Sequence, residues 1–288
     1  MLSTTEITNR SFQLYKQNWK PMLIAGFISF AITQLADISV DGEIGTSLLE
    51  LVLGVLIAPI AQGGYYFYQM NVWSEKPSSV KDILYFLKSV RSFGKALWFF
   101  FCYSIVTSVA IIITAVIPIL YIALLGGAGL DKITLYFAAL IILIPFFWLM
   151  ARFILSPYLY IGNSEEGVFV IIAKSFEMMK GYIGKLILII LMSTLIELVY
   201  FIPEFIIEEA GLQSGAASAI LFVLHLLVYP LTSMMMAGFA CEVLREHGVI
   251  TDESAELVEE DNESYVLHDD EAQDAVIVET KEDNVYYD

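Results

Sequence analysis

Six long apolar segments dominate this sequence, at about 21–38, 47–70, 96–124, 134–155, 186–207 and 216–241. A helix of about 17 to 25 apolar residues crosses a bilayer, because each residue advances it by about 1.5 Å. Hydrophobic residues make up 58% of the chain and its mean hydropathy is +0.71, which is far more apolar than a soluble domain. We therefore expect an all-α, polytopic integral membrane protein with six transmembrane helices in three hairpins.

A charged stretch with helical periodicity precedes each pair of apolar segments. Each stretch opens with a possible capping pair, whose side chains bind free amide groups at a helix start: Ser3 with Glu6, Ser79 with Asp82 and Asn163 with Glu166. In the third stretch, apolar residues recur at steps of three and four opposite Lys174 and Lys180. We expect an amphipathic interfacial helix before each hairpin, with its apolar side in the acyl boundary. The alternative for 164–185 is a longer transmembrane helix with a polar start.

The unit of surface helix and hairpin recurs about every eighty residues. This spacing predicts one six-helix transmembrane domain, 1–247, with an internal threefold repeat of 3–75, 79–160 and 163–247. Each copy enters the membrane from the same side, so the repeats would be parallel, unlike the inverted repeats of many transporters. The alternative is that three unrelated hairpins with amphipathic connectors share the pattern.

The bases are distributed unevenly about the six apolar segments. Thirteen of them flank one side, and only Lys132 flanks the other. Cytoplasmic loops carry the excess of Lys and Arg, so we expect a multi-pass cell-membrane protein with both termini in the cytoplasm. Anionic lipid headgroups are the expected partners of these bases. The candidate lipid-surface contacts are Lys16, Lys20, Lys81, Lys88, Arg91, Lys95, Arg152, Lys174, Lys180 and Lys185.

The last segment, 248–288, has a different composition. From residue 251 on, fifteen Asp and Glu accompany one base, Lys281. So little apolar surface cannot offset the entropy of ordering the chain, which predicts an acidic, disordered cytoplasmic tail. The tail either keeps the protein soluble or binds a basic protein partner or the chain's own lysine-rich connectors. Its charge argues against nucleic-acid binding, which requires clustered bases.

Two ionisable residues fall inside apolar segments, where such groups are costly and often functional. Glu197 lies about 17 Å along the fifth segment at the helical rise, and His225 lies about 14 Å along the sixth from the opposite side. Antiparallel helices would bring the two to one depth. The pair either carries protons or binds an ion, or it is a polar clamp that holds the hairpin together.

Soluble-type catalytic chemistry is nearly absent from the sequence. No catalytic or nucleotide-binding motif occurs, and His225, His247 and His268 are dispersed. The two cysteines are both expected in the reducing cytoplasm, which argues against a disulfide. We therefore expect no enzyme activity, no cofactor and no metal site.

Short sequences on both sides of residue 163 resemble a known family. They are Arg152-Phe153, Ser156-Pro157-Tyr158, Lys174-Ser175 and Met178-Met179-Lys180-Gly181. They resemble the bacterial integral membrane proteins of the family "domain of unknown function 975", which is similar to YciC-like proteins and to the membrane domain of some glycerophosphodiester phosphodiesterases. The resemblance covers residues 1 to about 247 and leaves out the acidic tail. It implies a multi-spanning protein of a Gram-positive bacterium and supplies no catalytic residues.

Two functions follow as expectations. The first is a non-enzymatic membrane protein, an accessory or scaffold factor in cell-envelope or lipid homeostasis. The alternative is a small transporter or permease with a midplane polar site at Glu197 and His225. A water-filled path to the midplane would favour the transporter, whereas a dry bundle filled with Leu and Ile would favour the scaffold.

Overall fold

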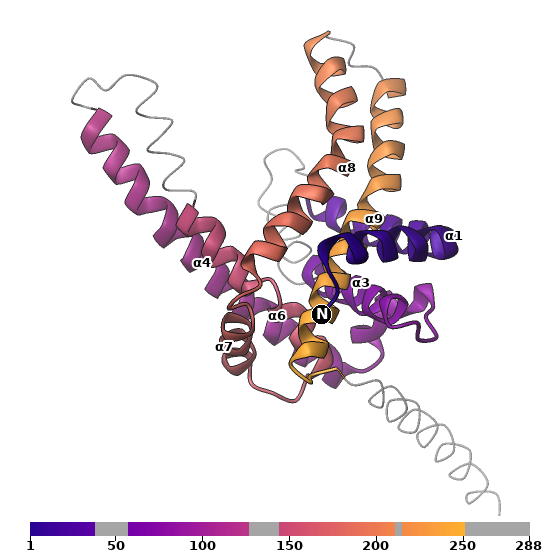
Figure 1. Ribbon diagram of the computed structural model, residues 1–288, viewed down its shortest axis with the longest axis horizontal. Helices are drawn as coiled ribbons and strands as arrows, with labels where there is room; N and C mark the ends of the chain where they lie inside the picture. Colours follow the sequence, from indigo (N-terminus) through magenta and orange to yellow (C-terminus); the bar gives the residue numbers. More distant parts are fainter. Residues whose placement is uncertain (38–56, 127–143, 211–214, 251–288) are drawn as a thin grey trace, which may run out of the picture. The chain divides into compact units, whose positions relative to one another are not determined.

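The computed structural model describes residues 1–37, 57–126, 144–210 and 215–250, and this part of the chain contains helices and no strand (Figure 1). The expectation of an all-α protein is therefore confirmed for these residues. Parts of the second and fourth predicted segments, Lys132 and the acidic tail from 251 on lie outside them. The helices are α1 (Thr4–Asp37), α3 (Ala58–Trp73), the 3-10 helix η2 (Val80–Leu87), α4 (Val90–Gly126), α6 (Ser156–Gly162), α7 (Val168–Met178), α8 (Ile183–Glu209) and α9 (Gly215–Glu246).

Four helical stretches are long and apolar enough to cross a membrane: Val90–Ile112, Ile144–Gly162, Ile183–Ile207 and Gly215–Glu246. They coincide with the third to sixth apolar segments of the sequence. The first two segments do not reach the same length and hydropathy within the described residues. Membrane-compatible helices are thus confirmed, whereas six spans in three hairpins stay a prediction.

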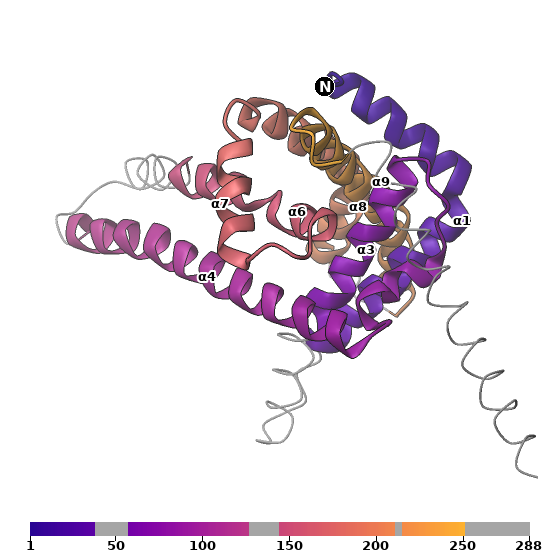
Figure 2. The same cartoon turned by 90° about the horizontal axis from the view of Figure 1, so that it is seen from below.

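The helix α9 lies at the centre of residues 1–249, because it packs against α1, α3, α6 and α8 (Figure 2). Its second half, from Pro230 to Leu244, is largely buried. Glu242, inside this half, accepts hydrogen bonds from the backbone N–H of Leu2 at 3.3 Å and from the indole N–H of Trp73 at 3.4 Å. The beginning of the chain is thereby joined to α9.

Two of the three predicted capping pairs are confirmed. Ser3 and Glu6 exchange hydrogen bonds at the start of α1. Ser79 and Asp82 form a capping box at η2, which is a 3-10 helix and ends at Leu87. A non-helical backbone at Asn18 divides α1 just before Pro21, so the polar first part and the apolar second part are separate helical pieces.

The third predicted capping pair is wrong. Asn163 lies at the C-terminal end of α6, and α7 begins only after Gly167, without a side-chain cap. The two predicted capping side chains instead contact each other, since the Asn163 amide donates to Glu166 Oε1 at 2.7 Å. Glu166 therefore stabilises the loop between two helices and not a helix start.

The predicted apolar face of α7 is covered by protein. Ile172 packs in a cluster with Ala110 and Phe153, and Met179, on the same predicted face, is 0% exposed. Phe169, on another side of the helix, is 68% exposed. The expectation that this apolar face enters the acyl boundary is therefore wrong, because neighbouring helices already bury it.

Candidate functional site

A half-open pocket of about 350 Å³ lies among α3, α4, α6, α8 and α9. Polar side chains from four of these helices line it: Gln62 of α3, Tyr103 of α4, Glu197 of α8, and Tyr229 and Ser233 of α9. The helices that supply them are largely apolar, and these polar groups converge on one place in the helical domain. We call this space the Glu197 pocket.

A network of hydrogen bonds backs the pocket and joins several of its polar side chains. Gln62 accepts from Ser29 Oγ at 3.1 Å and donates to Tyr229 Oη at 3.1 Å. Ser233 Oγ accepts from Gln69 Nε2 at 2.6 Å and lies 3.1 Å from Tyr65 Oη. Buried polar groups need such partners, so the network fixes the relative positions of α1, α3 and α9.

Glu197 differs from the other polar residues of the pocket. It is half-buried, and it forms no hydrogen bond or ion pair with any described residue. His225 lies among aromatic rings, with centroid distances of 5.1 Å to Phe30, 5.0 Å to Tyr200 and 5.8 Å to Tyr229. The two residues are close enough for an electrostatic interaction. No hydrogen bond joins them in the described structure, so their role as a pair stays a prediction.

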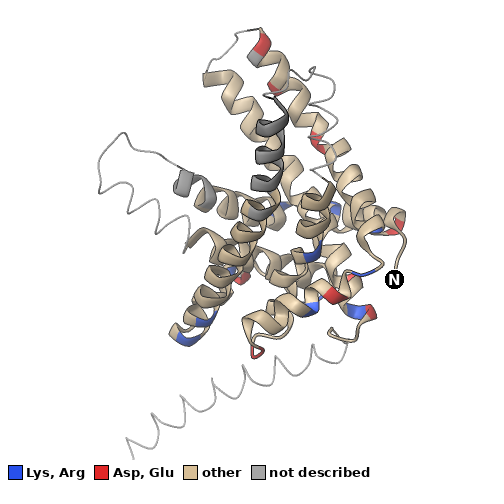
Figure 3. Cartoon of the chain, turned by 90° about the vertical axis from the view of Figure 1, so that its left-hand side faces the viewer, with Lys and Arg blue, Asp and Glu red and all other residues tan. Residues whose placement is uncertain are grey.

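Six of the ten bases predicted to contact lipid have exposed side chains: Lys16, Lys20, Lys81, Lys88, Arg91 and Lys180. None of the six forms an ion pair with another described residue. Figure 3 shows basic residues in the middle and lower parts of that view, with acidic residues among them, and an acidic segment at the top. These charges are therefore available to groups outside the protein.

Three further bases are held by the protein's own side chains. Lys95 donates to Glu165 Oε1 at 2.6 Å, and this hydrogen bond holds the pKa of the Glu165 carboxyl below its usual value. Lys174 is paired with Glu166. Lys185 lies 3.4 Å from the sulfur of Met1. Lys95 and Lys174 are thus less available to lipid than the six exposed bases.

Arg152 is buried and lies within the helical domain. Its guanidinium group donates to the carbonyl oxygen of Phe176 at 2.8 Å and lies over the rings of Trp148 and Phe176, at 4.4 and 4.9 Å. Ser175 Oγ donates to the carbonyl oxygen of Arg152 at 2.7 Å. Arg152 therefore joins α7 to the preceding helix, and an exposed lipid contact does not fit its position.

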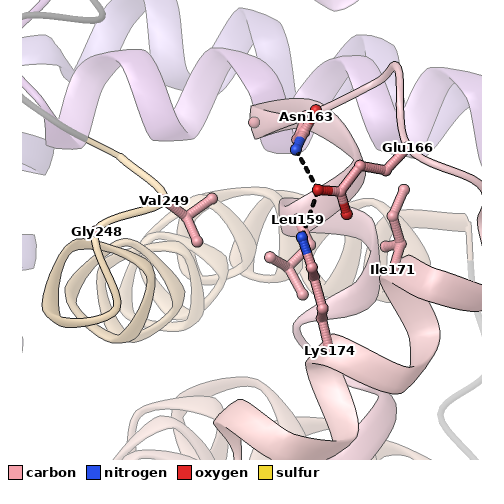
Figure 4. Close-up of a pocket in the computed structure, with 8 residues that line it drawn as sticks. Leu159, Asn163, Glu166, Ile171, Lys174, Gly248 and Val249 are labelled. Atoms are coloured by element: carbon pink, nitrogen blue, oxygen red, sulfur yellow. Dashed lines mark hydrogen bonds and ion pairs between the residues drawn. The ribbon is translucent and has the colours of Figure 1, made fainter.

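A second pocket, of about 280 Å³, lies beside the loop between α6 and α7 (Figure 4). Asn163, Glu166 and Lys174 line it together with Val249, and Figure 4 shows both Asn163 and Lys174 directed at the Glu166 carboxylate. The charges of this pocket are already paired with each other. It is therefore a weaker ligand site than the Glu197 pocket.

The described residues contain no group of three His, Cys, Asp or Glu side chains that could hold a metal ion. No family model, curated protein or solved structure matches this chain. The resemblance to the family named above therefore stays a prediction.

Sequence reasoning identified Glu197 but missed the residues around it. Gln62 and Tyr229 are polar residues in apolar segments, and that signal was present in the sequence. Their depth along each segment was also readable. The sequence did not show which side of each helix faces the other helices, because apolar residues surround both positions.

Proposed function

We propose that this chain is a non-enzymatic, six-pass protein of the cell membrane, with both termini in the cytoplasm, that acts as an accessory factor in lipid or envelope homeostasis. Four apolar helices support the membrane location. In this arrangement the bases mark the cytoplasmic surface, and they bind anionic headgroups.

The observation that carries this proposal is the set of six exposed bases without an ion-pair partner among the described residues. Each base near an anionic membrane surface contributes about 1 kcal/mol of attraction, which corresponds to about fivefold in affinity. Lys81, Lys88 and Arg91 lie within eleven residues at η2 and the start of α4. They form an exposed group of three bases.

Lipid preference around this group can be measured with the indole of Trp98, which is 60% exposed near the start of α4. We expect brominated phosphatidylglycerol to quench Trp fluorescence of the reconstituted full chain more than brominated phosphatidylcholine. The combined changes Lys81→Gln, Lys88→Gln and Arg91→Gln should reduce this preference by about a hundredfold, since they remove three charges that each contribute about 1 kcal/mol. The same variant should fail to restore the lipid composition of cells that lack the chain.

The matched control replaces three exposed apolar positions and leaves the bases in place, for example Leu84→Gln, Leu87→Gln and Val90→Gln. This control should keep the preference for phosphatidylglycerol. Equal quenching by the two lipids in the unaltered protein would contradict the proposal.

A transporter is the second candidate function, and the Glu197 pocket is the observation that favours it. A polar pocket among membrane-compatible helices gives a hydrophilic ligand a place within the bilayer. Ligand flux into proteoliposomes that depends on Glu197 would support this function over the accessory role.

A further inference from the structure

The Glu197 carboxylate forms no ion pair with a described residue, although His225 lies close enough to interact with it electrostatically. No Lys or Arg lines the pocket, and no described residue donates a hydrogen bond to Glu197. A carboxylate without partners is unfavourable in a low-dielectric interior, and a bound cation would remove this penalty. The charge of the pocket therefore selects cations and disfavours anions.

The remaining walls indicate which kind of cation fits. The rings of Tyr66, Tyr103, Tyr158 and Tyr229 contribute to the lining, and aromatic faces attract ammonium groups. Calcium and magnesium prefer several oxygen ligands, usually with more than one carboxylate, whereas Glu197 is the pocket's single acid. Apolar side chains such as Ile154 and Met236 complete the walls, and they suit an organic group.

Access to the pocket is from the apolar outer surface of α8. Ile190 lines the pocket and is 42% exposed, and Thr194, one turn further along, is also exposed. Their neighbours Ile187 and Leu191 are 58% and 54% exposed. In a membrane this surface faces lipid, so an amphiphile can reach Glu197 from within the bilayer.

We propose that the Glu197 pocket binds the ammonium group of an amphiphilic amine, with Glu197 as the counter-charge, tyrosine rings around the cation and the apolar part toward the lipid-facing side. The ammonium group comes either from the headgroup of a lipid such as phosphatidylethanolamine or from a free apolar amine. This inference rests on the membrane arrangement proposed above and is independent of transport and of the exposed bases.

The test uses the full chain in detergent with phenylethylammonium as the free probe and N-acetylphenylethylamine as its uncharged analogue. The unaltered protein should bind the ammonium and not the amide. Glu197→Gln should weaken binding by about tenfold or more, because a hydrogen bond to a charged group is lost. Glu204→Gln is the matched control, since Glu204 lies on the same helix, accepts from Tyr200 at 2.9 Å and lies outside the pocket.

A second experiment tests whether the bound ammonium group belongs to a lipid headgroup. Protein released from nanodiscs with equal phosphatidylethanolamine and phosphatidylglycerol is analysed by native mass spectrometry. Retained phosphatidylethanolamine that is lost in Glu197→Gln but not in Glu204→Gln supports a headgroup as the source, whereas binding of the free probe alone supports a soluble amine.

The comparison of ammonium with amide is made on the unaltered protein, so it holds even if Glu197→Gln fails to fold. Equal binding of the two probes, or no binding of either, together with no selective retention of phosphatidylethanolamine, would overturn the inference. If the variant of Lys81, Lys88 and Arg91 lost its preference for phosphatidylglycerol but still bound the ammonium probe, the inference about the Glu197 pocket would still hold.

Discussion

Gly64 lies where α3 approaches η2 most closely. A Cβ atom at this position would lie 1.8 Å from the carbonyl oxygen of Ile83, which is a backbone atom and cannot rotate away. We expect Gly64→Ala to separate α3 from η2 and to destabilise the domain by about 3 kcal/mol or more, above the usual cost of overpacking. Thermal unfolding of the purified protein in detergent measures this loss.

Gly94 provides the control for this substitution. It lies near the start of α4, and a Cβ atom there would meet no other atom within 4 Å. Gly94→Ala should leave the melting temperature unchanged or raise it, because alanine favours helix more than glycine by about 1 kcal/mol. Similar melting temperatures for the two variants would show that α3 and η2 are not in such close contact.

At the level of single residues, the sequence identifies candidate site residues better than it identifies which residues they contact. Glu197 stands out because charged residues are rare in apolar segments. Its neighbours Gln62 and Ser233 come from segments far away in the chain, and their convergence depends on how α3 and α9 pack. The predicted lipid contact of Arg152 does not fit the structure for the same reason, because the local sequence does not show that α7 and its neighbours bury this side chain.

Among the elements, α7 is an amphipathic helix whose apolar face packs against other helices of the protein and not against lipid. We expect Ile171→Ala to weaken the docking of α7 by about 2 kcal/mol or more, because it leaves a cavity under a side chain that is 1% exposed. The amide groups of 168–178 should then exchange hydrogen about thirtyfold faster, as measured by mass spectrometry.

Phe169→Ala is the corresponding control on the same helix. Phe169 is 68% exposed, so its removal leaves no cavity inside the protein. Exchange of the α7 amides in detergent should stay close to that of the unaltered chain. If the two substitutions accelerated exchange equally, the buried face of α7 would be misassigned.

Helix starts and apolar faces could be predicted to different extents. The capping pairs at Ser3 and Ser79 are local patterns, and the structure confirms both. Asn163 fits the same pattern but ends α6, because a capping residue and a helix-ending residue can share a sequence signature. The period of α7 was recognised correctly, yet periodicity cannot distinguish a face that meets lipid from one that meets protein.

For the whole molecule, α8 provides a test of orientation. This helix of 27 residues is about 40 Å long, so its two ends can lie on opposite sides of a bilayer. Ser164→Cys, before α8, should react with a membrane-impermeant maleimide only in permeabilised cells, whereas Glu209→Cys should react in intact cells. The natural Cys102 and Cys241 are buried and should contribute little background. The reverse pattern would overturn the proposed topology.

The central position of α9 has a consequence for biosynthesis. The helix α9 contacts α1, α3, α6 and α8, and all four precede it in the chain. Until it arrives, Glu242 is absent, and Leu2 and Trp73 lack the hydrogen-bond acceptor that joins them in the finished domain. These helices therefore emerge from the ribosome before the helix that they pack against, and their contact surfaces are covered by protein only once α9 has been made.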